Sequence, residues 1–339
     1  MNVIKIKNLF LIILLVIAIG IFTTLSKHNK KESEDNKENV NTEITNEIVL
    51  KYPKEMIDKG FTEEIRFSEM PKRVVVATYP PVLALHKLGV NMIAIPDSKT
   101  PIWPKELDEN TFKVSVGRKS NLKIETIIEM NPDLIFLSAS NKDKYDHLLK
   151  DANIPVYYIE AGHSIDYDNV KSQTIALIDA FGKNTKASKE ILDSFTSIEN
   201  KISETKRKYD SKTVMALQYG QNSPYIQSEK GIIGALAKMV GFTNVYVNEE
   251  ASMVPINTEL ALTYNPNVIM CVSGMEDPKV LQNTMENDFS KNADYWYSID
   301  AIKNKRVIYF SSKFLLNTGI GYLNNIEEFI RILDEQYEL

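Results

Sequence analysis

The chain is poor in the residues that most often carry chemistry. Its 339 residues include one cysteine and four histidines, and no histidine pair has the spacing of a zinc site. The cysteine, Cys271, excludes a disulfide within the chain, and its apolar neighbours predict a buried thiol. No nucleophile elbow, phosphate-binding loop or dinucleotide-binding glycine fingerprint is present. With a net charge of −5 and no long basic block, a nucleic-acid partner is not expected either. These absences favour a protein that is not an enzyme and uses no catalytic cofactor.

The only long apolar run lies at the N-terminus. Lys5 and Lys7 precede an uncharged stretch from Leu9 to Leu25, so residues 1–26 form either a secretory signal or a membrane anchor. The only small-x-small site lies inside the apolar stretch, at Ala18 to Gly20, which favours an uncleaved anchor. Residues 27–46 are mostly charged and polar and predict a disordered tether.

A repeat indicates two similar lobes. The stretch from Glu125 to Ile135 is echoed by the stretch from Glu259 to Ile269. Each copy has a glutamate seven residues before a proline and an apolar run after it. This pattern is typical of a short helix that ends at the proline and is followed by a buried strand. Two lobes would leave a cleft between them, and clefts are where ligands bind.

Alternating strands and helices predict an α/β fold with two doubly wound lobes. We expect an N-terminal lobe over 47–167, a linking helix over 168–210 that is interrupted once at Gly182, and a C-terminal lobe over 211–339. The stretch from Pro96 to Val114 is expected to be a long loop that carries Trp103.

Several stretches, in order and spacing, resemble the class III substrate-binding proteins of bacterial ABC importers, which carry haem, cobalamin and ferric siderophores. The resemblance covers about Met70 to Asp334. It rests on Pro71–Val76, Leu85–Val90, Val116–Ile135, Gly241–Val245 and Ala301–Val307. It implies two α/β lobes joined by one long backbone helix, and an extracytoplasmic receptor at the cell membrane, anchored or secreted. The implied partners are an ABC permease and its ATPase.

Within that family the second half most resembles the Gram-positive haem-receptor lipoproteins, through Asn287 to Trp296. Those receptors hold haem iron with a methionine that would fall near 118–120 and a histidine that would fall near 273–275. This sequence has no methionine at the first place and no histidine at the second. The stretch from Leu217 to Tyr225 instead resembles the corresponding loop of cobalamin-binding relatives. The resemblance therefore implies a transported chelate, haem or a ferric siderophore, with a corrinoid as the alternative.

A flat chelate needs aromatic surfaces and cations, and the loops that follow strands are the places to find them. The ligand-binding candidates on such loops are Tyr79, Trp103, Arg118, Lys119, Tyr219, Tyr225, Met275 and Phe314. No metal ligand is certain; Tyr79 and Met275 are the candidates for an axial ligand.

In the resembled family, one surface glutamate on each lobe docks onto arginines of the permease. Glu125 and Glu259, the twin acids of the repeat, match that role. Two other functions stay open at this point. One is an enzyme on the same scaffold, such as a chelatase or a reductase, and the other is a surface adhesin that no longer binds a chelate.

Overall fold

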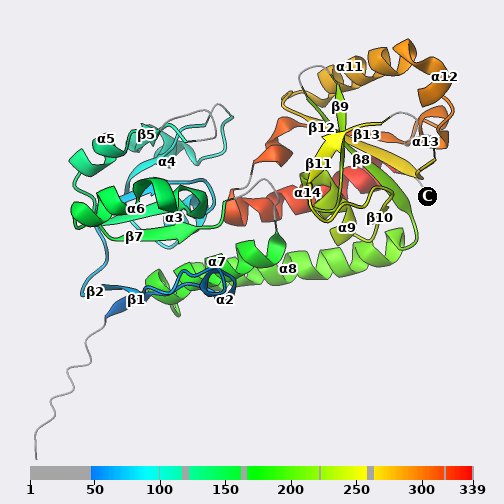
Figure 1. Cartoon of the computed structure of the whole chain (residues 1–339). Coiled ribbons are helices and arrows are strands. Elements are labelled where there is room, and N and C mark those ends of the chain that lie inside the picture. Colours follow the sequence, from blue (N-terminus) through cyan, green and yellow to red (C-terminus); the bar gives the residue numbers. More distant parts are fainter. Residues whose placement is uncertain are drawn as a thin grey trace, which may run out of the picture. The chain divides into compact units, whose positions relative to one another are not determined.

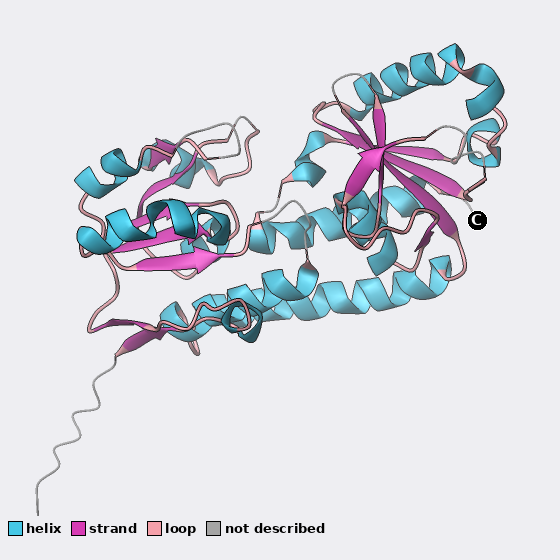
Figure 2. Ribbon diagram, in the orientation of Figure 1, coloured by secondary structure: helices cyan, strands magenta, loops and turns pink. Residues whose placement is uncertain are grey.

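The computed structural model describes residues 47–98, 100–116, 122–161, 166–220, 223–257, 263–316 and 318–337. Residues 46–339 form one compact unit (Figure 1). Two separate sheets, each flanked by helices, make up most of this unit (Figure 2). Among the described residues, none of the helices combines the length and apolar character needed to span a bilayer.

The first lobe is built on a five-stranded parallel sheet. Its strand order is β5-β4-β3-β6-β7, so the chain starts at the centre and winds outward in both directions. The strands are β3 (Val74–Ala77), β4 (Met92–Pro96), β5 (Phe112–Val114), β6 (Leu134–Ser138) and β7 (Val156–Ile159). The central β3 is buried at every position, as its uninterrupted run of apolar residues predicts. The helices are α3 (Val82–Lys87), α4 (Lys105–Asn110), α5 (Ile124–Glu129) and α6 (Lys142–Asp151).

The second lobe is built on a mixed sheet of order β11-β9-β8-β12-β13, with β10 paired to β8. Strands β8, β12 and β13 run parallel, whereas β9 is antiparallel to both β8 and β11. The strands are β8 (Thr213–Tyr219), β9 (Pro224–Gln227), β10 (Thr243–Asn244), β11 (Met253–Pro255), β12 (Val268–Ser273) and β13 (Val307–Phe310). The helices are α9 (Ile232–Met239), α11 (Pro278–Lys291), α12 (Ala293–Trp296) and α13 (Asp300–Lys303).

Two helices carry the chain from one sheet to the other: α7 (Tyr167–Phe181) and the 24-residue α8 (Lys186–Tyr209). The break falls at Gly182, as predicted. A Cβ atom there would lie 2.3 Å from Leu88 Cδ2, so only glycine fits this approach without a shift. Thr185 then caps α8 by accepting a hydrogen bond from the Ser188 amide.

The C-terminal helix α14 (Tyr322–Gln336) packs along α8. Ion pairs Lys201–Glu327 and Lys208–Asp334 join the two helices. Two single-turn segments precede α14: η2 (Ser312–Leu315), which contacts β12 and α9, and η3 (Gly319–Gly321), which contacts α3 and α7. The chain therefore returns to the first lobe after completing the second sheet.

The repeat has a structural role that its sequence did not reveal. In each copy, the asparagine before the proline has a positive φ, +47° at Asn131 and +31° at Asn265. The residue after the proline caps the start of the neighbouring strand. The Asp133 carboxylate accepts hydrogen bonds from the amides of Lys72 and Arg73, and Asn267 Oδ1 accepts one from the Thr213 amide. The two copies thus tie the central pair of parallel strands in each sheet.

The predicted fold class, two α/β lobes with a long connecting helix, is confirmed. Two local expectations are corrected. The segment from Pro96 to Val114 is not one loop, because α4 and the edge strand β5 lie within it. The stretch from Leu217 to Tyr225 is not all loop, because its two ends belong to β8 and β9, which pair antiparallel. A short antiparallel pair, β1 (Ile48–Leu50) with β2 (Ile65–Phe67), and α2 (Lys54–Ile57) precede the first sheet; β1 packs on α7.

Candidate ligand-binding site

A pocket lies between the two lobes where their parallel strands end, and we call it the interlobe pocket. Its volume is about 410 Å³. The first lobe contributes Leu83 and the segment Thr100–Ile102 after β4. The second lobe contributes Glu276 after β12, Ser311 to Lys313 after β13, and residues at the start of α14. Loops at the carboxyl ends of parallel strands are the usual position of a ligand in α/β folds.

Charged and polar groups line the second-lobe wall of this pocket. Lys313 Nζ lies 3.3 Å from Glu328 Oε1. A hydrogen bond from Arg331, helped by Lys313, lowers the pKa of Glu328 to about 2, so this carboxylate is ionised at neutral pH. Ser311 Oγ is shielded from solvent and has no hydrogen-bond partner among the described residues. The wall therefore carries a lysine that is paired with Glu328 and a buried hydroxyl without a described partner.

Tyr79 and Trp103, both predicted site residues, lie together in the first lobe. Their rings stack with centroids 5.9 Å apart and planes inclined by 20°. The Tyr79 hydroxyl donates a 2.6 Å hydrogen bond to the Asp97 carbonyl, and Trp103 Nε1 donates one to the Pro96 carbonyl. Burial raises the pKa of Tyr79. Tyr79 is therefore a neutral donor whose proton is already engaged, which disfavours it as an axial ligand.

The second-lobe candidates are more dispersed. The Tyr219 hydroxyl donates to Asp288 Oδ2 at 2.7 Å, and burial together with that carboxylate raises its pKa to about 12. Tyr225 packs over Gly220, where a Cβ atom would lie 2.8 Å from its ring. Phe314 is 1% exposed and packs against Phe310 and Phe329, so its ring is a core element. None of these three is among the described residues that line the interlobe pocket.

Met275 lies beside the interlobe pocket without lining it. Its backbone is held on both sides, because its amide donates to Ser273 Oγ and its carbonyl accepts from the Ser312 amide. Its side chain packs against the second-lobe core. Arg118 and Lys119 fall outside the described residues, and so does Glu259. Glu125, the partner acid of the repeat, is exposed in the first turn of α5.

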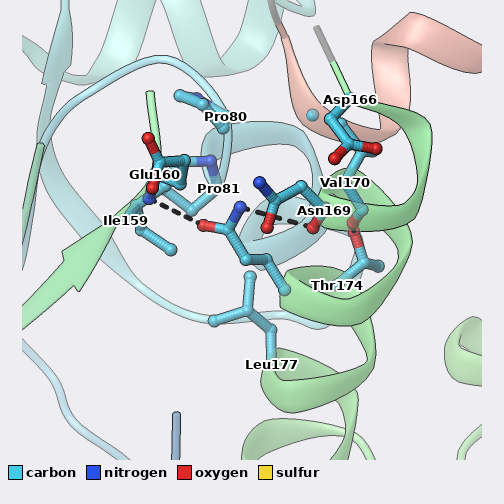
Figure 3. Close-up of a pocket in the computed structure, with 11 residues that line it drawn as sticks. Pro80, Pro81, Ile159, Glu160, Asp166, Asn169, Val170, Thr174 and Leu177 are labelled. Atoms are coloured by element: carbon cyan, nitrogen blue, oxygen red, sulfur yellow. Dashed lines mark hydrogen bonds between the residues drawn. The ribbon is translucent and has the colours of Figure 1, made fainter. Parts of the chain in front are cut away.

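A second, much smaller pocket lies beneath the interlobe region, between Pro80, Pro81 and α7 (Figure 3). Its volume is about 20 Å³, which is room for about one water molecule. Gln173 crosses it, accepting from the Glu160 amide and donating to the Asn169 carbonyl. Asn169 Oδ1 faces no partner among the described residues. This site is too small for a chelate.

Metal-binding side chains are not gathered anywhere in the described ranges: no group of three or more His, Cys, Asp or Glu residues could hold an ion there. Burial raises the pKa of the Cys271 thiol, which is fully enclosed. The pocket residues that sequence reasoning missed are Glu276, Ser311 and Lys313. Each lies within three residues of the end of β12 or β13, so the rule that placed Tyr79 could have found them.

Comparison with known proteins gives the class. Residues 74–313 match the periplasmic binding protein family. The high-affinity heme uptake system protein IsdE of Staphylococcus aureus is 26% identical over 242 residues, which cover 69% of this chain and 77% of that protein. The crystal structure of S. aureus IsdE complexed with heme superimposes with a TM-score of 0.60 at 20% identity, covering 79% of this chain and 99% of that one. The crystal structure of the petrobactin-binding protein YclQ of Bacillus subtilis superimposes with a TM-score of 0.63 at 22% identity, covering 86% of this chain and 99% of YclQ.

The chain therefore belongs to the periplasmic binding protein family. The predicted class, a two-lobed substrate-binding protein of the ABC-importer type, is confirmed. The relative IsdE is named as a protein of a high-affinity heme uptake system.

Proposed function

We propose that this protein captures an iron chelate in its interlobe pocket on the outer side of the membrane and delivers it to an ABC permease with its ATPase. The observation that carries the proposal is that both lobes contribute strand-end loops to one pocket. A ligand held there contacts Ile102 on one side and Lys313 on the other. Its binding would therefore favour one relative position of the lobes, which a permease could recognise.

The side chains present favour a chelate that saturates its own metal. The interlobe pocket has no His, Cys or Met among its described lining residues. The hydroxyls of Tyr79 and Tyr219 are engaged as donors elsewhere. A ferric siderophore supplies all the iron ligands itself and needs only hydrogen bonds and charge from the protein. We therefore propose a ferric siderophore as the ligand, with haem as the second candidate and a corrinoid as the third.

The N-terminal segment completes the proposal. Residues 1–26, as an uncleaved anchor, would hold the receptor at the membrane, and residues 27–46 would act as its tether. Both lie outside the described residues. Sequencing the N-terminus of protein from native membranes tests this part: a start at or near Met1 is expected. A start after Gly20 or Ser26 would show a cleaved signal.

The ligand is tested by adding ferric siderophores, haem and cobalamin in turn to the full chain and following its thermal unfolding. A ligand at about 100 times its Kd should add roughly 2.7 kcal/mol to the unfolding free energy. Lys313→Gln should weaken the binding of an anionic chelate about tenfold. Lys303→Gln, which alters another half-exposed lysine of the second lobe, is the control.

Two outcomes would contradict this function. Absence of a shift with every chelate at about 100 µM would remove the receptor role and leave the adhesin alternative. Release or reduction of the iron by the protein would instead indicate a chelatase or reductase.

A further inference from the structure

A third pocket shares residues with the interlobe pocket, and we call it the lateral pocket. Its volume is about 350 Å³, within the range of small-molecule sites. Most of its wall is apolar: Leu83, Ile102, Trp103, Ile191, Ile320 and Leu323. These side chains come from α3, the segment after β4, α8, η3 and α14. The pocket is therefore formed jointly by the first lobe, the connecting helix α8 and the C-terminal part of the chain.

The two pockets share part of their walls. Leu83, Pro101, Ile102, Gly321 and Asn324 line both of them. Their chemistry differs, however. Glu276 and Lys313 line only the interlobe pocket, whereas Trp103, Ile191, Ile320 and Leu323 line only the lateral pocket.

The lateral pocket also has polar lining residues: His86, Lys87, Ser194 and Asn324. His86 Nε2 lies 3.3 Å from Glu106 Oε1, and Lys87 is exposed at the end of α3. Ser194 donates its hydroxyl hydrogen bond to the Glu190 carbonyl of its own helix. The apolar side chains of the pocket would gain free energy from contact with an apolar group of a ligand.

We infer that the lateral pocket holds an apolar arm of the chelate whose iron-binding head occupies the interlobe pocket. The ligand is then amphipathic: a polar, metal-saturated head that carries a short acyl or similar apolar chain. This inference rests on the proposed function, because it assigns the head to the interlobe pocket. Each buried methylene contributes about 0.8 kcal/mol, so an arm with two or three methylenes enclosed strengthens binding at least about tenfold.

The test compares matched chelates on the full chain held in lipid nanodiscs. The probes are a ferric trihydroxamate and a ferric carboxylate chelate, each with and without an N-hexanoyl chain, titrated by tryptophan fluorescence. Trp103 forms part of the lateral wall, and the other tryptophan, Trp296, is 3% exposed in the second-lobe core. The acylated chelate should bind at least about tenfold tighter than its parent and change the Trp103 emission.

Three variants of α8 localise the effect. Ser194→Phe places a ring in the lateral pocket and should abolish the advantage of the acyl chain while leaving the parent chelate bound. Ser194→Ala keeps the pocket open and should retain the affinity advantage of the acyl chain. Thr196→Phe adds the same ring at an exposed position of the same helix, so it controls for folding and for lipid partitioning.

The outcomes separate the two proposals. Equal affinities for parent and acylated chelates, or an acyl advantage that survives in Ser194→Phe, would overturn the lateral-pocket assignment and leave the proposed function standing. Failure of every probe to bind would contradict the proposed function, and this inference with it.

Discussion

Gly319 and Pro80 bring the two lobes into backbone contact. A Cβ atom at Gly319 would lie 1.9 Å from the Pro80 carbonyl oxygen. Gly319 belongs to η3, which follows the second sheet, and Pro80 belongs to the turn after β3 in the first. The lobes are therefore joined by this close approach as well as by α7 and α8, and the neighbours of Gly319, Thr318 and Ile320, line the interlobe and lateral pockets.

The contact predicts a large effect of one methyl group. Gly319→Ala should lower the free energy of unfolding by about 2 kcal/mol or more, because φ is +60° and the new Cβ meets backbone rather than a movable side chain. Urea denaturation measures the change. Gly274→Ala is the matched control, since its added Cβ would meet nothing within 4 Å. Equal stability of the two variants would show that the approach is looser than described.

The repeat predicts that asparagine can replace Asp133, because Asn267 occupies the equivalent position in the second copy. Asp133→Ala should destabilise the first lobe by about 2 kcal/mol, because the amides of Lys72 and Arg73 lose a charged acceptor. Asp133→Asn should cost less than about 1 kcal/mol, since Asn267 performs the same capping in the second lobe. Thermal unfolding compares the two variants. A larger loss for the asparagine variant would contradict the equivalence of the copies.

The ion pairs of Glu328 predict a pH dependence. Its pKa falls from an ordinary 4.5 to about 2 in the folded protein, mainly through the Arg331 hydrogen bond, with Lys313 of η2 facing the same carboxylate. Because the folded pKa is depressed, this stabilisation is complete above about pH 4.5 and is lost as the pH falls towards 2. Glu328→Gln should thus be less stable than the parent at pH 6, with the difference fading by pH 3.

The pH effect is modest because Arg331, which also pairs with Glu335, is half exposed and screened by solvent. A double-mutant cycle with Arg331→Gln, run at pH 6 and pH 3, isolates the pair. A coupling that is unchanged between the two pH values would rule out this assignment.

The twin acids predict a separation of uptake from binding. Lysine at both 125 and 259 should lower chelate uptake by cells strongly, because a carboxylate can pair with an arginine of the permease in two hydrogen bonds. Chelate affinity of the purified protein should stay unchanged, since Glu125 is exposed on α5 and away from the pockets. Glu129→Lys, on the same helix, is the control. If the double variant binds the chelate more weakly but associates normally with the permease, the two acids belong to the ligand site and not to the docking surface.

Strands β3 and β9 differ in whether the sequence alone predicts them. The four consecutive apolar residues from Val74 to Ala77 predict a strand of a parallel sheet, because such strands are covered on both faces. All four residues of β3 are buried in the structure. Strand β9 was not predicted, because Pro224 to Gln227 has no such run and is a strand only through its pairing with β8 and β11. In the same way, β5 was missed because it is an edge strand whose Phe112 is exposed.

The sequence by itself determined the elements whose signal is local: buried strands, the helix break at Gly182, and the repeat that indicated two lobes. Only the tertiary structure decided which strand-end residues face a common pocket. Tyr79 and Trp103, both candidates from the sequence, stack on each other in the first lobe. The candidate Phe314 is buried in the core, whereas its neighbour Lys313 lines the pocket. These neighbours in the chain differ because Phe314 packs against Phe310 of β13 and Phe329 of α14. Those contacts set which side of η2 is buried, and the one with α14 exists only in the folded chain.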